Sequence, residues 1–270
     1  MSCDTIFRNP SRLLKAGSRV GAPGLIAPAS WVAGGVFLIA FLTFSATLSR
    51  GVCPGESGIA AAQALGALSC SPGEHPVWLA AARAVGRIPL GDTVMRLNLF
   101  SALCGALAAA LLFRFLDRLF FDSICEPLAL RLVPSADDNA SVPPDPAEVR
   151  DDARAGLIAT LGALTAAVSF AFSTPVWMAS TALHAQTFHA VLLIAAADRI
   201  ADYAFTGRAG SCMAAVFMIG LFSLEAPSLT ALAPVGACFI LRIAGRHGQL
   251  SESFVFALLA TVLSGAAIAA

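Results

Sequence analysis

Acidic and imidazole side chains gather in a few short stretches of an otherwise apolar sequence. Glu56, Glu74, His75, His184 and Glu225 lie in or next to segments that separate long apolar runs. Carboxylates and imidazoles are the side chains that most often transfer protons in enzymes. Polar groups beside membrane spans are energetically unfavourable, so their placement there points to a function. The pattern indicates a site for acid–base chemistry at one face of a membrane.

Four arginines lie in the same part of the sequence: Arg50, Arg83, Arg87 and Arg96. Arginine presents a planar fork of N–H donors that matches phosphate oxygens. Carboxylates, imidazoles and arginines at a lipid boundary would suit a substrate that carries phosphate on a lipid tail. Arg83 and Arg87 also have a simpler interpretation, in which they extend to the phosphates of membrane lipids.

The candidate acids and histidines have simpler interpretations as well. Glu56 precedes a candidate short helix, where a carboxylate can serve only to complement the helix dipole. Glu225 can be a solvated turn residue. His184 and His189 are five positions apart, which is a poor spacing for one helical face, so we expect no joint metal site from them. The predicted site therefore has no metal ligand, although a divalent ion is left open.

The composition is typical of a polytopic membrane protein. Hydrophobic residues make up 57% and charged residues 13% of the chain, whereas soluble domains have roughly a quarter charged residues. Four of the 17 basic residues lie between Arg50 and Arg96, and the others fall on what would be the opposite side of the apolar runs. Lysine and arginine are retained in the cytoplasm during insertion, so that opposite side is predicted to be inside. The net charge of zero, without blocks of like charge, argues against nucleic acid as a partner.

Several apolar runs are candidates for transmembrane helices, which need roughly 20 residues to cross the bilayer core. They lie at about residues 25–48, 97–116, 155–172, 183–197, 212–224, 229–241 and 254–270. The first run is longer than the apolar region of a signal peptide, which favours an uncleaved anchor over a cleaved signal. The predicted fold class is all-α, with about seven spans and a cytoplasmic amino terminus. The last run is still apolar at Ala270, as expected of the front part of a longer protein.

The predicted organisation has four parts, which are a basic amino terminus (1–25), two spans with a large outer loop (26–121, loop 49–93), a flexible cytoplasmic linker (122–154) and about five further spans (155–270). Prolines and acidic residues in the linker leave little to bury. Within the outer loop, residues 57–68 and 76–87 are predicted as short helices. The second is amphipathic and suited to the headgroup region.

The cysteines and the known catalytic motifs add one structural expectation. Cys53 and Cys70 lie seventeen positions apart in the outer loop and would form a disulfide in an oxidising compartment. No CxxC, HExxH, Walker or GxSxG motif is present in the sequence. The missing phosphate-binding loop argues against an ATP-driven pump.

Several segments together resemble a bacterial membrane family catalogued as domain of unknown function 2723, which is related to the protein O-mannosyltransferases of the GT-C class. The most specific segment is R-L-N-L-F-S-A-L at residues 96–103, which is similar to the R-x-N-L-x-S-A-L of the family. The other matching segments are G-E-S-G at 55–58, A-A-A at 60–62, L-G at 65–66, P-G at 72–73, H-P at 75–76, A-F-S at 171–173 with Trp177, and G-L at 220–221.

The sequence also departs from the family pattern at several of its polar positions. The first loop acid, an Asp in the family, corresponds to Glu56, and the second falls on Ile59. The loop histidine of the family corresponds to Cys70 or is displaced to His75. H-A-Q at 184–186 replaces Glu-Val-Tyr, and E-A-P at 225–227 replaces the later Asn-His.

The resemblance implies a bacterial inner-membrane glycosyltransferase that takes a sugar from a polyprenyl-phosphate donor to an acceptor hydroxyl of a protein or glycan. Glu56 would be the base. The residues implied to bind the substrate are Arg83, Arg87, Arg96, His75, Trp177, His184 and Glu225. The departures favour an alternative, a non-catalytic lipid-binding or scaffolding protein. A transporter is less favoured, because the polar groups are predicted at one membrane face and not at its middle.

Overall fold

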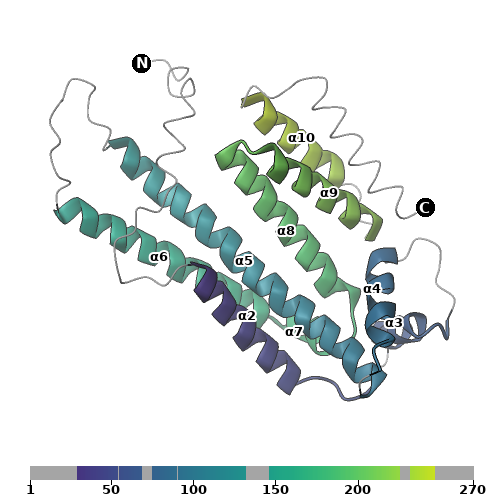
Figure 1. The fold of residues 1–270 in the computed structure, drawn as a ribbon. Helices are drawn as coiled ribbons and strands as arrows, with labels where there is room; N and C mark the ends of the chain where they lie inside the picture. Colours follow the sequence, from purple (N-terminus) through teal and green to yellow (C-terminus); the bar gives the residue numbers. More distant parts are fainter. Residues whose placement is uncertain are drawn as a thin grey trace.

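The computed structural model describes residues 29–53, 55–68, 75–89, 91–131, 146–225 and 232–246, and every regular element in these ranges is an α-helix (Figure 1). The predicted all-α class is therefore confirmed. The helices are α2 (Ala29–Ala46), α3 (Glu56–Ala64), α4 (Pro76–Gly86), α5 (Thr93–Arg131), α6 (Pro146–Ala171), α7 (Thr174–Thr181), α8 (Ala185–Thr206), α9 (Ala209–Glu225) and α10 (Leu232–Arg246).

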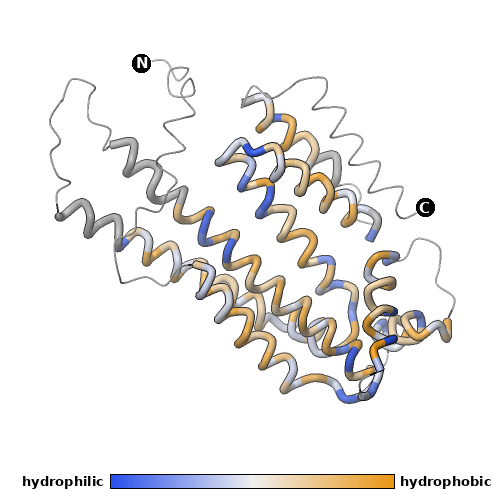
Figure 2. Tube along the Cα trace, viewed as in Figure 1, coloured by the Kyte–Doolittle hydropathy of each residue, from blue (hydrophilic) through white to orange (hydrophobic). Residues whose placement is uncertain are grey.

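Three of these helices are long and apolar enough to cross a membrane, namely α2, Thr93–Phe121 of α5 and Arg154–Ala171 of α6. The count is up to four if α7 and α8, which meet at an angle of 118°, form one broken span. Figure 2 shows hydrophobic residues along most of the length of the helices. The described ranges are thus compatible with a multi-pass membrane protein.

The predicted number of about seven spans is not confirmed in the described ranges. The apolar parts of α9 and α10, Ala209–Ser223 and Gly236–Gly245, are shorter than the roughly 20 residues that a span requires. The predicted run at 254–270 lies outside the described residues. The predicted linker at 122–154 also differs, because α5 continues to Arg131 and α6 already begins at Pro146.

Helix α5 is central to the bundle and contacts α2, α4, α6, α7 and α8. Its small residues Ala102, Ala106 and Ala109 are completely buried against α2 and α6. Gly105 faces α7 so closely that a Cβ there would lie 2.1 Å from Ser180 Oγ. Small residues permit such close helix approach where lipid removes the hydrophobic drive. The stretch at 105–110 is therefore a packing face.

At one end of the bundle, where α5 and α8 approach their carboxyl ends, ion pairs join the helices. Arg118 of α5 lies 3.5 Å from Asp198 and 3.2 Å from Asp202 of α8. Asp117 of α5 accepts a hydrogen bond of 2.8 Å from Thr160 of α6. The polar residues thus fix the relative positions of three helices at this end.

The opposite end carries the short helices α3, α4 and α7 and the first turns of α5 and α8 (Figure 1). Trp78 of α4, Leu97 of α5 and Leu183 before α8 are buried in one cluster there. The predicted short helices at 57–68 and 76–87 correspond to α3 and α4. The segment at 173–177 lies between the predicted apolar runs at 155–172 and 183–197. In the structure it begins the helix α7, whose proline occupies a first-turn position that needs no N–H donor.

Candidate functional site

The site is built around the beginning of α4 and the end of α9. His75 is the residue before α4 and has a φ of 50°, in the left-handed region. The carboxylate of Glu225, the last residue of α9, accepts hydrogen bonds from the backbone N–H groups of Val77 and Trp78, the latter at 2.9 Å. These N–H groups have no partner inside the helix. A carboxylate there also complements the positive end of the helix dipole.

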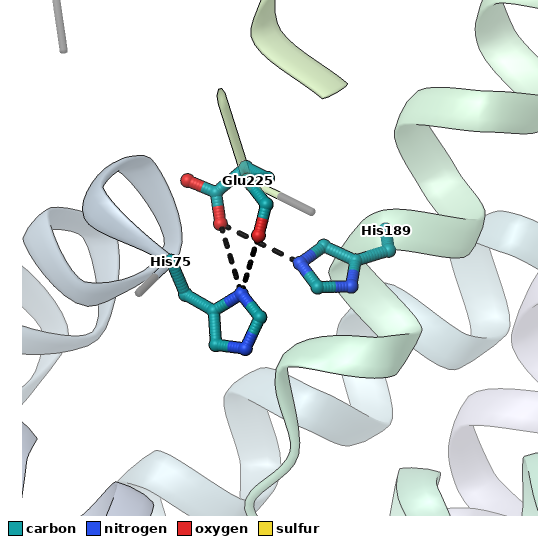
Figure 3. A group of neighbouring side chains, drawn as sticks. All are labelled: His75, His189 and Glu225. Atoms are coloured by element: carbon teal, nitrogen blue, oxygen red, sulfur yellow. Dashed lines mark hydrogen bonds and ion pairs between the residues drawn. The ribbon is translucent and has the colours of Figure 1, made fainter. Parts of the chain in front are cut away.

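Two imidazoles flank this carboxylate, one from α4 and one from α8 (Figure 3). His189 Nε2 lies 3.5 Å from Glu225 Oε2, and His75 Nδ1 lies 3.9 Å from the same oxygen. His75 Nδ1 also lies 2.5 Å from the backbone carbonyl oxygen of Glu225. The two imidazole rings are 4.8 Å apart, and Phe222 of α9 lies edge-on to His189 at 6.2 Å. We call these three residues the His–His–Glu cluster.

The cluster is buried on one side and accessible on the other. The side chain of Glu225 is 0% exposed and that of His189 is 14% exposed, whereas that of His75 is 39% exposed. Glu225 Oε2 and His189 Nε2 are both buried, and the contact between them lacks hydrogen-bond geometry, so neither atom has a hydrogen-bond partner. A buried polar atom without a partner costs about 1–3 kcal/mol of stability. An arrangement that keeps two such atoms facing one another requires an explanation.

The donor atoms of the cluster can act in two ways. Two imidazole nitrogens and a carboxylate oxygen lie within 4.8 Å of one another, so they could hold a metal ion. Without a metal, the same groups could accept and donate protons. In either role, these groups lie at the ends of apolar helices.

The structure brings together two of the residues that the sequence indicates, His75 and Glu225, and adds His189. From the sequence, His189 is paired only with His184, and no joint metal site is predicted for the two. Its real partners lie more than thirty positions away on either side, and no local spacing reveals them. The available signal was an imidazole inside an apolar run, which is energetically unfavourable without a function.

Glu56, the predicted base, is the first residue of α3 and is exposed. It does not belong to the His–His–Glu cluster. Glu74 lies outside the described residues, as does Cys70, so the predicted disulfide is not tested. Cys53 contacts Ser49 through its thiol, which donates to Ser49 Oγ at 3.2 Å.

The arginines differ in their surroundings. Arg96 donates to the carbonyl oxygens of Gly86 and Gly91 at 3.0 and 2.8 Å, so its guanidinium holds the connection between α4 and α5. Arg83 on the last turn of α4 is exposed, and its guanidinium donates to the carbonyl oxygen of Gln63 at 3.4 Å. Arg87, which directly follows α4, is exposed as well.

Trp177 and His184 are also placed outside the cluster. The Trp177 ring packs edge-on against Phe44 of α2, with 5.6 Å between ring centroids. His184 is the residue before α8, and its backbone N–H donates to Ser101 Oγ at 3.1 Å. Both residues join helices at this end of the bundle. The sequence indicated their location but not these packing roles.

A small hollow lies between α5, α6, α7 and α8, with a volume of about 110 Å³. Thr187 and Gln186 are its polar lining residues. Pockets for drug-sized ligands have volumes of about 300–1,000 Å³, so this hollow is too small for a substrate with a lipid tail. The His–His–Glu cluster remains the candidate site.

Comparisons with protein-family models, with curated proteins and with solved structures gave no match. The cluster and the apolar helices are therefore the features that indicate a function.

Proposed function

We propose that this chain is a membrane glycosyltransferase-like protein that transfers a sugar from a polyprenyl-phosphate donor to an acceptor hydroxyl. In this proposal it resides in the bacterial inner membrane, with a cytoplasmic amino terminus and about seven GT-C-like spans. The acceptor belongs to a protein or a glycan. The observation that carries the proposal is the placement of exposed Glu56 on α3 near exposed Arg83 and Arg87 of the α4 region, at the end of apolar helices.

The surroundings of the cluster support a lipid-phosphate substrate. Apolar helices provide a lipid-facing surface for a polyprenyl chain. Arg83 on α4 and Arg87 directly after it are exposed, and Glu225 holds the first turn of the same helix. Guanidinium groups at this position could bind the donor phosphate, which would orient the sugar towards the end of the bundle.

In the proposed reaction, Glu56 accepts the proton of the acceptor hydroxyl. The acceptor oxygen forms a bond to the anomeric carbon of the sugar while the bond from that carbon to the phosphate oxygen breaks. Polyprenyl phosphate leaves with the electron pair. The exposure of Glu56 is compatible with an acceptor that arrives from the aqueous side.

The experiment is transfer of a labelled sugar from a polyprenyl-phosphate donor, measured in membranes containing Glu56→Gln. We expect a loss of about 100-fold or more, because general base catalysis contributes 10²–10⁴-fold in rate. Asp92→Asn is the matched control, since Asp92 is an exposed carboxylate of the same loop that accepts from the Val94 N–H. Equal transfer by the Glu56 variant and the control would refute the role of Glu56.

A non-catalytic lipid-binding or scaffolding function is the second candidate. It is favoured by Ile59, which is 53% exposed on α3 at the position of the second acid in the resembled family. The occupation of the Arg96 guanidinium by backbone carbonyls favours it too. Donor lipid that binds to the purified protein without any transfer, in the variant and in the wild type alike, would support this function.

A further inference from the structure

We infer that His75, His189 and Glu225 form a binding site for one divalent transition-metal ion, with Zn²⁺ as the representative ion. The inference depends on the geometry of the three side chains and not on glycosyl transfer, so it stands or fails independently of the proposed function.

The separations of the donor atoms are close to those of a metal site. Zinc lies about 2.0–2.2 Å from nitrogen and oxygen ligands, which places neighbouring ligands of a tetrahedron roughly 3.3–3.6 Å apart. The distance from Glu225 Oε2 to His189 Nε2 is 3.5 Å, and that to His75 Nδ1 is 3.9 Å. All ligand atoms lie within 4.8 Å of one another. His75 is the most exposed of the three residues. A movement of about 1 Å by its imidazole would place the three donor atoms at three corners of the tetrahedron.

The types of donor atom restrict the choice of ion. Calcium and magnesium prefer shells made only of oxygen. Imidazole nitrogens suit zinc and its neighbours in the first transition row, and two histidines with one carboxylate form a common catalytic set. A set of three protein ligands leaves a fourth position for water or for a substrate oxygen. Here that position would be reached past the half-exposed ring of His75.

A purely structural role for the cluster explains only half of its contacts. Glu225 Oε1 holds the first turn of α4 through the N–H groups of Val77 and Trp78. This leaves Glu225 Oε2 and His189 Nε2 buried, facing one another and without hydrogen-bond partners. A cation between them would satisfy both. The carboxylate would then separate the ion from the positive end of the α4 dipole.

Binding also makes a specific demand on His75. Its Nδ1 now lies 2.5 Å from the carbonyl oxygen of Glu225 and would have to leave this oxygen to bind the ion. The left-handed backbone conformation of His75 is less strained for histidine than for a bulky residue. His75 directly precedes the rigid first turn of α4. The ring can therefore turn without a change in the helix.

The test is a titration of the full chain with Zn²⁺. The protein is purified in detergent through a tag without histidines, treated with a chelator, and titrated against a fluorescent zinc indicator. X-ray absorption of the loaded protein gives the ligand distances. We expect one ion per chain and nitrogen or oxygen ligands at about 2.0–2.2 Å.

Three variants distinguish a ligand from a structural residue. Glu225→Gln keeps an oxygen for the N–H groups of Val77 and Trp78 but removes the charge, and His189→Phe keeps a ring beside Phe222. Each should weaken zinc binding by about 100-fold or more, beyond the 10–100-fold typical of residues that only support a ligand. His184→Ala, which removes a histidine outside the cluster, should bind zinc as the wild type does.

Two results would overturn the inference: wild-type protein that binds zinc no more tightly than the Glu225→Gln and His189→Phe variants, or equal weakening by His184→Ala. Thermal unfolding of each variant without metal verifies that the fold is retained. Cluster variants that lose zinc binding but keep sugar transfer would support the metal site and show that the metal has no part in the transfer reaction. Loss of transfer in Glu56→Gln alone bears only on the proposed function.

Discussion

At the residue scale, Glu225 connects three parts of the chain that are far apart in sequence. One carboxylate oxygen binds the first turn of α4, and the other faces His189 of α8. An acidic side chain with 0% exposure is rarely left without strong partners. Glu225 is therefore a buried member of a folded cluster and not the solvated turn residue that the sequence also permitted.

Gly105 is a second residue on which the arrangement depends, because α5 and α7 nearly touch there. We expect Gly105→Ala to reduce the free energy of unfolding by about 1–3 kcal/mol, as overpacking does. The added Cβ would lie 2.1 Å from Ser180 Oγ and 2.9 Å from Ser180 Cβ, so a rotation of the hydroxyl alone cannot relieve the contact. The measurement is unfolding in detergent.

Gly35→Ala in α2 is the matched control, since nothing lies within 4 Å of a Cβ there. That change should be neutral or stabilising by about 0.5–1 kcal/mol, the usual preference for alanine in a helix. A second substitution, Ser180→Gly, should restore part of the stability lost in Gly105→Ala. Equal stability of the Gly105 and Gly35 variants would show that the helices do not approach so closely.

The members of the site were predictable only in part. His75 and Glu225 stand in polar stretches between apolar runs, which drew attention to them. His189 lies within an apolar run, and its partners come from α4 and α9, so only the tertiary fold reveals the association. The role of Arg96 was hidden for the same reason, because its acceptors are backbone carbonyls that the sequence does not distinguish.

At the element scale, the segment at 96–103 has a structural explanation. Its polar side chains hold the connections around the first turn of α5. Asn98 donates to the carbonyl oxygen of Ser49 at 2.9 Å, and Ser101 accepts from the backbone N–H of His184. Asn98 and Ser101 are both 1% exposed. The most specific segment of the resemblance thus assembles the end of the bundle that carries the cluster.

The other end of α5 is joined to α8 by charge. We expect Arg118→Met to reduce the free energy of unfolding by about 1–3 kcal/mol. This is less than the 3–5 kcal/mol for a fully buried pair, because the Arg118 side chain is 31% exposed. The loss arises because Asp198, only 3% exposed, would lose one of its two arginine partners.

Unfolding in detergent measures this effect, with Arg114→Met as the control. Arg114 is an exposed arginine one turn earlier on the same helix. Its replacement should change stability by no more than about 0.5 kcal/mol, as is usual at the surface. If both variants unfolded alike, the ion pairs would contribute nothing to the α5–α8 contact.

The elements themselves were more predictable than the site. The amphipathic stretch at 76–87 predicted α4 with nearly its observed bounds. Its first residue is a proline, which suits the first turn of a helix. The eight-residue α7 was missed, because Pro175 within a short polar segment is equally typical of a turn. The spans after α7 were counted from apolar runs alone. Such runs do not distinguish a helix that crosses the bilayer from a shorter helix packed within the protein.

At the scale of the whole molecule, the polar groups divide between two ends. The His–His–Glu cluster lies at the end with α3 and α4, and the ion pairs of Arg118 lie at the other (Figure 1). Figure 2 shows mostly hydrophobic positions between them. This separation is the one expected when the two ends face different aqueous compartments.

Cysteine labelling tests this orientation. In a variant without the seven native cysteines, Gly51→Cys should react with a membrane-impermeant maleimide added to intact spheroplasts. Arg208→Cys should react only after permeabilisation, because it lies at the opposite end, between α8 and α9. Both positions are exposed, so accessibility within the protein does not bias the comparison. The reverse pattern would place the cluster in the cytoplasm and exclude an outer-face transfer reaction.

The sharp bend between α7 and α8 has a consequence for biogenesis. With eight residues, α7 is far too short to partition into lipid by itself. At the bend, the backbone N–H of His184 donates to the hydroxyl of Ser101 on α5. Because a side chain of α5 holds this bend, we expect the α7–α8 arrangement to form only after α5 is in place.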